Sequence, residues 1–227
     1  MSDRPRVALV GASGLVGREI VAEAARRNHG NLHIIVRRRP EWLAAAPVPV
    51  FVEDPSRWDR VVEDIRPDVL ICALGTTWRK AGRDEQAFRA VDHRLVVATA
   101  KAAQQHGATR MVVVSAVGAT PASRSFYLRV KGEMERDLAT LGFAQLDILR
   151  PGLLHGTRQA DFRLMERVAA ILSPVTDRVL LGGARRYRSI SARTVAQAAL
   201  TLSRTTEEGV RVFHNDDMRR LAGAIAA

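Results

Sequence analysis

The sequence predicts a single α/β domain built on a doubly wound parallel sheet, and three observations support this prediction. Short apolar runs alternate with helix-length segments from the N-terminus onward. These runs are continuously rich in Val, Leu and Ile, as strands covered on both faces are. A glycine-rich turn directly follows the first run and opens the first helix. Repeated strand–helix–strand units connect by right-handed crossovers, which places helices on both faces of one sheet.

Strands and helices are expected to follow one another closely through residue 151. The apolar runs predict strands at Val7–Val10, Leu32–Val36, Val48–Val52, Val69–Ala73, Met111–Ser115 and Leu146–Leu149. The periodicity of apolar residues predicts helices at Leu15–Arg27, Trp58–Ile65, Asp84–His106 and Phe126–Leu141. Gly107 and Gly142 lie where C-terminal capping glycines belong, so each is expected to end a helix.

The rhythm changes after residue 151. A loop over 152–160 precedes an expected helix at 161–172, a helix at 192–202, a strand at 210–213 and a helix at 216–226. This segment of about 75 residues is too short for an independent domain. We therefore expect one domain over residues 1–227, with a core of residues 1–151 and a small C-terminal cap of residues 152–227 on the substrate side.

The formal net charge of +11 raises the question of a nucleic-acid partner. The 32 arginines are scattered over most of the expected helices, with no interleaved aromatic residues and no RNA-binding motif. Only three lysines accompany them, at Lys80, Lys101 and Lys131. This skew is typical of coding bias, so a nucleic-acid partner is not expected. A chain that keeps so few lysines draws attention to each of them.

One cysteine and the absence of long apolar runs bear on the compartment. Cys72 lies inside an apolar run and has no partner for an internal disulfide, which indicates a reducing compartment. The N-terminus shows no apolar signal-peptide core, and no run approaches the roughly 20 residues that cross a bilayer. The six histidines show no metal-ligand spacing. We therefore expect a soluble, cytoplasmic protein with no membrane partner and no metal.

The glycine-rich turn has the spacing Gly11, Gly14, Gly17 between the first strand and the first helix. In this context the first glycine allows the tight turn, the second lets a diphosphate approach the backbone, and the third lets helix and strand pack closely. The free amides and positive end of the helix then stabilise phosphates. The alternative is a tight turn without a ligand. We predict a Rossmann-type dinucleotide site over residues 1–151, with contacts from Gly11, Ser13, Gly14, Leu15, Val16 and Gly17.

The end of the second strand indicates which dinucleotide binds. An acidic residue there would bind the ribose 2′-hydroxyl and repel a 2′-phosphate. This chain has Arg37 and Arg38, and the next carboxylate is Glu41. A charge-assisted hydrogen bond to phosphate is worth roughly 1.5–3 kcal/mol. The arginines could also belong to the general bias, but we expect NADP(H), with Arg37 as the main contact and Arg38 next.

Tyr127 and Lys131 are the expected catalytic pair. They are four residues apart on a predicted helix and therefore project from one face. A free phenol has a pKa near 10, and a neighbouring ammonium, aided by an oxidised nicotinamide, favours the phenolate. Tyr127 can then exchange a proton with a substrate oxygen, which contributes on the order of 10²–10⁴-fold. Taken alone, such a pair would more often be an interfacial tyrosine and a solvated lysine.

Several of these stretches together resemble the atypical short-chain dehydrogenase/reductase superfamily. Within it the chain is similar to the branch of the Tat-interacting-protein oxidoreductases and their bacterial relatives, and we expect a bacterial protein. The resemblance covers about residues 6 to 158, and its more specific stretches are 74–77 and 127–133. It rests on Gly11–Gly17, Arg37-Arg38, Leu74-Gly75-Thr76-Thr77, Lys80-Ala81-Gly82, Val114-Ser115, Ser125–Glu133 and Leu149-Arg150-Pro151-Gly152.

The resemblance implies further roles. Ser115 would polarise the substrate oxygen, and Lys131 would hold the nicotinamide ribose. Many relatives have a second serine where this chain has Ala116, and extended relatives place an asparagine where it has Asp92. The remaining implied cofactor contacts are Asp54 near the adenine, Ala73, Leu74, Gly75 and Thr76 on the adenine-ribose side, and Pro151, Leu153 and Leu154 over the nicotinamide.

Two functions are compatible with these features. The first is an NADP(H)-dependent oxidoreductase that acts on a small carbonyl or alcohol, with Tyr127 as general acid and base. The second is a regulatory or protein-binding module that senses NADPH without turnover, which Ala116 and the short cap favour. The segment after residue 151 is too short for the nucleotide-sugar subdomain of an epimerase. Neither the substrate nor the oligomeric state is indicated.

Overall fold

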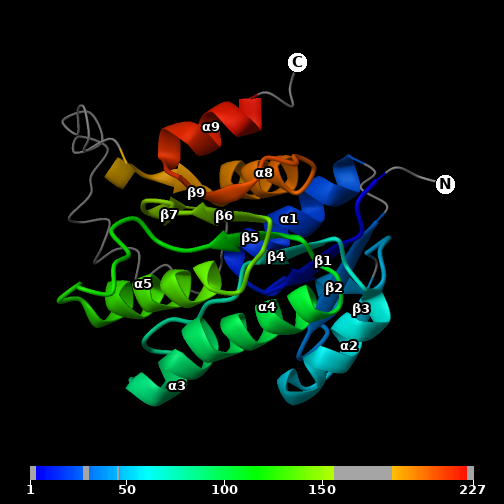
Figure 1. Cartoon of the computed structure of the whole chain (residues 1–227), viewed down its shortest axis with the longest axis horizontal. Coiled ribbons are helices and arrows are strands. Elements are labelled where there is room, and N and C mark those ends of the chain that lie inside the picture. Colours follow the sequence, from blue (N-terminus) through cyan, green and yellow to red (C-terminus); the bar gives the residue numbers. More distant parts are fainter. Residues whose placement is uncertain (1–3, 28–30, 45, 156–185, 224–227) are drawn as a thin grey trace.

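A computed structural model of the chain describes residues 4–27, 31–44, 46–155 and 186–223. Its centre is a sheet of seven strands in the order β3-β2-β1-β4-β5-β6-β9, and every neighbouring pair is parallel (Figure 1). The strands are β1 (Val7–Val10), β2 (Leu32–Val36), β3 (Val50–Val52), β4 (Val69–Cys72), β5 (Arg110–Val114), β6 (Gln145–Leu149) and β9 (Gly209–Phe213). The predicted doubly wound parallel sheet is confirmed.

The direction of winding reverses between β1 and β4. From β1 the chain runs outward through β2 to β3 and then returns to add β4 on the other side of β1. The strand carboxyl ends at such a point leave a crevice in which ligands of open α/β sheets bind. The glycine-rich turn after β1 and the segment after β4 therefore meet at the same edge of the sheet.

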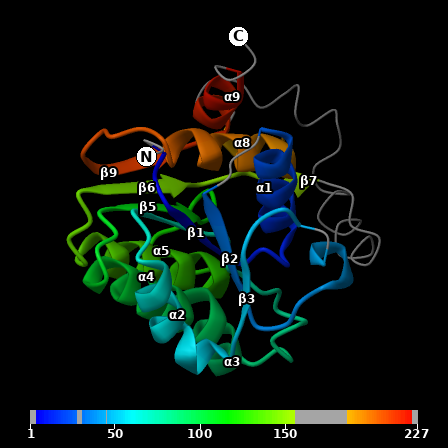
Figure 2. The ribbon, with the colours of Figure 1, turned by 90° about the vertical axis from the view of Figure 1, so that its right-hand side faces the viewer.

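Helices cover both faces of the sheet (Figures 1 and 2). One layer holds α1 (Leu15–Arg26) and α8 (Ala192–Leu202), with α9 (Asn215–Gly223) packed outside α8. The other layer holds α2 (Trp58–Ile65), α4 (Val96–Gln105) and α5 (Phe126–Ala139). Successive strand residues alternate between the two cores, so that Leu9 packs on the first layer and Val10 on the second.

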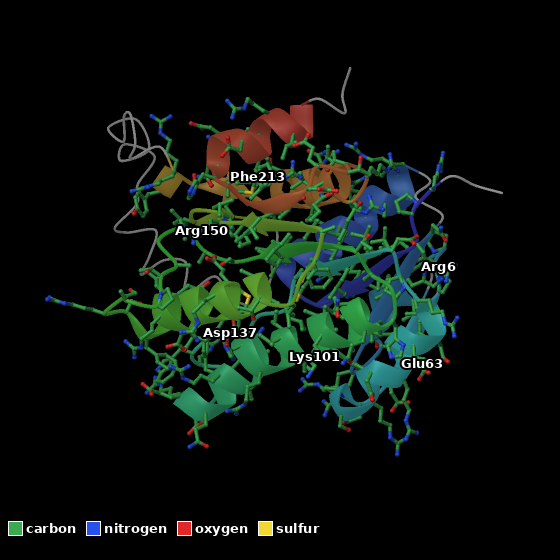
Figure 3. The ribbon with its side chains drawn as sticks, in the orientation of Figure 1. Arg6, Glu63, Lys101, Asp137, Arg150 and Phe213 are labelled. Atoms are coloured by element: carbon green, nitrogen blue, oxygen red, sulfur yellow. The ribbon has the colours of Figure 1, made fainter. Side chains whose placement is uncertain are left out.

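Many charged side chains lie on the outside of these layers. Those of Glu63 on α2 and Lys101 on α4 are exposed and point away from the sheet (Figure 3). Cys72, at the end of β4, is buried as expected, and burial raises the pKa of its thiol to about 11. Among the described residues, no helix combines the length and apolar character that a membrane span requires.

The expected C-terminal cap needs a correction for residues 186–223. Strand β9 pairs with β6 along its whole length and completes the main sheet. Helix α8 packs against α1 and contributes to the core on that face. Sequence patterning places a strand but not its partner, and here the partner lies about 60 residues away. The expected helix at 161–172 lies outside the described residues.

The long helix expected at 84–106 is divided into three parts. Asp84 caps α3 (Glu85–Arg89) by accepting a hydrogen bond from the Ala87 amide at 2.5 Å. A π-helical turn, Ala90–Leu95, then connects α3 to α4. The wider turn contains Asp92, and π-turns inside helices are frequent at functional sites. Short 3₁₀ helices at Glu41–Leu43 and Pro55–Arg57, and a parallel pair of β7 (Leu154–His155) and β8 (Ile190–Ser191), complete the described elements.

Candidate active site

The glycine-rich turn brings three backbone segments into close contact. Gly11 has a φ of +87°, and a Cβ atom there would lie 2.3 Å from the carbonyl carbon of Ala73. A Cβ atom on Gly17 would lie 2.2 Å from the Gly11 oxygen. Neither position has room for a side chain, so β1, α1 and the end of β4 pack backbone to backbone. Gly14 is the N-cap residue of α1. The helix has no side-chain cap and no acidic residue in its first turn, which leaves its N-terminus suited to an anion.

A cavity of about 630 Å³ opens in front of this turn. Its volume is in the range of small-molecule and cofactor sites. The cavity reaches from the turn to Arg37 at the end of β2, and Trp58 of α2 also lines it. Of the residues predicted to bind the cofactor, it is lined by Gly11, Ser13, Gly14, Arg37, Ala73, Leu74, Gly75 and Thr76.

Other predicted contacts lie away from this cavity. Arg38 is exposed and does not line it. The carboxylate of Asp54 accepts hydrogen bonds from the Ser56 hydroxyl and amide at 2.7 and 2.9 Å, which lowers the pKa of that carboxyl. The carbonyls of Pro151 and Leu153 accept hydrogen bonds from the amides of Val117 and Ile190. In this structure Asp54, Pro151 and Leu153 serve local structure, and their cofactor roles stay predictions.

A second cavity of about 160 Å³ adjoins the first and shares Gly14, Lys80 and the segment 73–76 with it. All three predicted catalytic residues, Ser115, Tyr127 and Lys131, line this cavity. It is also lined by the predicted cofactor contacts Leu15, Val16 and Leu154. The structure therefore places the catalytic residues next to the glycine-rich turn.

A buried ion pair lies in the wall of the second cavity. Lys131 Nζ is 2.9 Å from Asp92 Oδ1, and the two residues are 3% and 1% exposed. The amide of Thr76 donates a hydrogen bond to Asp92 Oδ2 at 2.7 Å. Burial lowers the pKa of Lys131, but the Asp92 carboxylate outweighs this effect and the net pKa is raised. The carboxylate of Asp92 thus forms an ion pair with Lys131 through Oδ1 and accepts a hydrogen bond through Oδ2, and its charge compensates the buried ammonium.

The pKa of Tyr127 is raised, contrary to the expectation that the phenolate is favoured. Burial of the hydroxyl is the main cause; Lys131 lowers the pKa as expected, and Asp92 raises it again. Solvent still reaches the residue, which is 42% exposed, and this screening limits the rise. Asp92 neutralises the field of the ammonium, and the local spacing of Tyr127 and Lys131 does not reveal this contact. Without a bound cofactor, Tyr127 is therefore a phenol at neutral pH.

Ser115 forms a hydrogen bond with Glu135, a residue that does not line the cavity. Its hydroxyl donates a hydrogen bond to Glu135 Oε1, and the same carboxylate binds Arg150 through Oε1–Nε and Oε2–Nη2 contacts of 3.1 and 2.5 Å. Arg150 is tied in turn to β9, because its amide donates to the carbonyl of Phe213 (Figure 3). Glu135 lies about two helical turns beyond Tyr127 on α5, and no motif in the sequence indicates a role for it.

An aromatic cluster links Tyr127 to the loop after β4. The ring of Phe88 packs edge to face on Tyr127 with centroids 5.9 Å apart, and Trp78 lies 5.6 Å from Phe126. From the same loop, Lys80 and Gly82 line the first cavity. No local pattern could reveal the cluster, because its members come from three segments.

Comparison with known proteins shows the family. The family described as NAD(P)H-binding matches residues 11–205. The protein named Protein FMP52, mitochondrial, from Candida albicans is 31% identical over 96% of this chain and 98% of its own length. The Aspergillus fumigatus protein of the same name is 36% identical over 86% of each chain. Among solved structures, dTDP-4-dehydrorhamnose reductase from Bacillus anthracis, in complex with NADP, is 15% identical with a TM-score of 0.66, over 100% of this chain and 82% of that one.

These relatives correct one expectation and confirm another. The expectation of a bacterial, cytoplasmic protein is contradicted, because the relatives are fungal and their names place them in mitochondria. A single buried cysteine and an excess of arginine distinguish no compartment, so the composition could not support that expectation. The expected superfamily, in contrast, agrees with both the family match and the fold. The chain belongs to the NAD(P)H-binding family.

Proposed function

We propose that this protein is an NADP(H)-dependent oxidoreductase that reduces a small carbonyl compound, with Tyr127 as the general acid. One observation carries the proposal: Tyr127 and the buried Lys131–Asp92 ion pair line a cavity that adjoins the glycine-rich turn. A buried ion pair contributes little net stability compared with apolar residues. Its position beside a titratable phenol is therefore better explained by chemistry.

The residues around the first cavity suit a dinucleotide. The start of α1 has no side-chain cap and no acidic residue in its first turn, which favours phosphate groups. When bound, NADPH would supply a hydride to the substrate carbonyl carbon. Tyr127 would donate its proton to the carbonyl oxygen, and Lys131, held by Asp92, would hold the nicotinamide ribose and keep a positive charge near the phenol. The raised pKa of Tyr127 favours this direction, since the phenol is the acid that reduction requires.

Preference for NADP(H) over NAD(H) is part of the proposal. Arg37 lines the first cavity at the end of β2, where a carboxylate would select NAD(H). A charge-assisted hydrogen bond to the 2′-phosphate would favour NADP(H) by roughly 1.5–3 kcal/mol. We propose a small-molecule substrate as the physiological partner.

The test is a panel of aldehydes and ketones, with NADPH consumption followed by absorbance. We expect turnover by the wild type and a loss on the order of 10²–10⁴-fold in kcat/KM for Tyr127→Phe. Tyr187→Phe changes the only other tyrosine and is the matched control. NADPH affinity should be retained in both variants. Equal activity of Tyr127→Phe and wild type would disprove the assignment of the acid.

A second candidate is an NADPH-sensing module without turnover. It is favoured by the Ser115 hydroxyl, which is bound to Glu135, and by Ala116, which cannot replace it. Tight NADPH binding with no oxidation across the whole panel would support this candidate and exclude the first.

A further inference from the structure

The hydroxyl proton of Ser115, a residue that lines the second cavity, bears on the substrate class. Ser115 and Glu135 are each 5% exposed, so the hydrogen bond between them is shielded from water. Both oxygens of Glu135 also contact the guanidinium of Arg150. A carboxylate paired in this way is ionised and can only accept hydrogen bonds. Ser115 is therefore the donor in its bond with Glu135.

A serine hydroxyl has one proton and two lone pairs. Because the proton of Ser115 is bound to Glu135, the hydroxyl can offer only lone pairs to a molecule in the cavity. It cannot share in polarising a carbonyl oxygen, as the resemblance to the superfamily had implied. A polar group that meets Ser115 must instead carry a hydrogen of its own. Tyr127 remains the hydroxyl donor to the carbonyl oxygen.

We propose that Glu135 is a positioning residue that turns Ser115 into a hydrogen-bond acceptor, and that the cavity consequently selects carbonyl compounds with a hydroxyl on the adjacent carbon. This inference rests on the proposed function, since it places the carbonyl oxygen at Tyr127. Ser115 and Tyr127 line the same cavity of about 160 Å³. In so small a space, the groups that bind Tyr127 and Ser115 must be separated by few atoms, as they are in an α-hydroxy carbonyl compound.

The preference for a hydroxyl group and the discrimination against a methyl group each have a physical cause. A substrate hydroxyl can donate a hydrogen bond to a lone pair of the Ser115 oxygen. A substrate with a methyl group at this place leaves the buried acceptor without a partner, which is costly. We expect the hydroxylated compound to bind roughly three- to tenfold more tightly.

The experiment compares two esters, methyl glycolate and methyl propionate, on the NADPH-saturated protein. The two have nearly the same shape and differ by a hydroxyl in place of a methyl group. Neither ester is expected to be reduced, so binding is measured without turnover. Dissociation constants are obtained by ligand-detected NMR titration of the wild type, Ser115→Ala, Glu135→Gln and a control, Glu133→Gln. The control removes a carboxylate on the same helix that pairs with Arg89 and does not line the second cavity.

In the wild type and in Glu133→Gln, methyl glycolate should bind roughly three- to tenfold more tightly. Ser115→Ala keeps the Glu135–Arg150 pair and should bring the ratio near one. In Glu135→Gln the side-chain amide can donate to Ser115, which frees the serine proton for the cavity and should lower or reverse the ratio. The variants therefore report selectivity, which a purely structural role of Glu135 would leave unchanged.

Three results would overturn the inference: no preference in the wild type, an unchanged ratio in Ser115→Ala, or no binding of either ester. The carbonyl panel tests the proposed function separately. A preference for methyl glycolate without turnover of any carbonyl compound would retain the acceptor role of Ser115 and reject the oxidoreductase. Turnover without the preference would retain the oxidoreductase and reject the acceptor role.

Discussion

The two adjoining cavities are built by different means. The larger one is shaped by backbone: Gly11 and Gly17 allow β1, α1 and the end of β4 to approach so closely that no Cβ atom fits between them. The smaller one is shaped by buried charge, since Lys131 and Glu135 each have an oppositely charged partner in its surroundings. The larger cavity should therefore be sensitive to added side-chain volume and tolerant of charge changes. The smaller cavity should be sensitive to charge changes and tolerant of added volume.

The largest effect is expected from breaking the ion pair. Lys131→Met leaves Asp92 as an uncompensated buried charge and should lower the free energy of unfolding by about 3–5 kcal/mol. Arg219→Met breaks an exposed pair with Asp216 and should cost at most about 1 kcal/mol. Urea unfolding measures both. A second change, Asp92→Leu, should recover much of the loss; if it does not, the loss does not come from the uncompensated charge of Asp92.

Gly11→Ala should have the next largest effect. The new Cβ atom would overlap the Ala73 backbone, and the φ of +87° is unfavourable for alanine. The two costs together are about 2–5 kcal/mol. Gly142→Ala is the matched control, because its φ is +81° but nothing lies within 4 Å of the added atom. It should carry only the conformational cost of about 1–2 kcal/mol. Equal losses in the two variants would refute the importance of the backbone contact.

Arg37→Gln tests the charge tolerance of the larger cavity. The change should leave the stability nearly unaltered and reduce the preference for NADPH over NADH by about ten- to a hundredfold, from the loss of roughly 1.5–3 kcal/mol. The ratio of the two dissociation constants is measured by fluorescence titration. Arg38→Gln, outside the cavity, should leave that ratio unchanged. A larger change in the Arg38 variant would transfer the 2′-phosphate contact to that residue.

The smallest effect is a shift in pH dependence. The rate of carbonyl reduction should be constant around neutral pH and fall as the pH rises through the raised pKa of Tyr127, because the phenol is the acid. Asp92→Asn removes a carboxylate that favours both the phenol and the Lys131 ammonium, so whichever group loses its proton first, the active state ends at a lower pH.

The control for the pH profile is Asp137→Asn. Asp137 lies on α5 and pairs with His93 and Arg136, away from the second cavity (Figure 3). Its removal should leave the profile in place. A profile that moves equally in both variants would show that the effect comes from general charge and not from the ion pair.

Much of the fold was predictable because its signals are short. The strand β4 can be recognised from the run Val69–Cys72, and the glycine-rich turn from three residues between a strand and a helix. The pair of Tyr127 and Lys131 on one helix face also depends only on local spacing. The role of β9 was not predictable, since its five residues read as a strand without showing that they pair with β6.

The charges of the active site depend on contacts between distant segments. Asp92 was noted only as a departure from asparagine, yet it compensates Lys131 and raises the pKa of Tyr127. No local pattern indicates the ion pair of Glu135 and Arg150, although Glu135 accepts the hydrogen bond of Ser115 and Arg150 pairs with Glu135. A sequence shows that these side chains can ionise but not which of them become buried together.

Periodicity and glycine spacing are properties of a few neighbouring residues, so the chain alone was enough to indicate a parallel sheet, a phosphate-binding turn and a tyrosine–lysine pair. The raised pKa of Tyr127 and the direction of the Ser115 hydrogen bond depend on the folded arrangement. Electrostatic interactions are strong only where water is excluded, and which charges share such a place is settled when helices and strands far apart in the chain pack together.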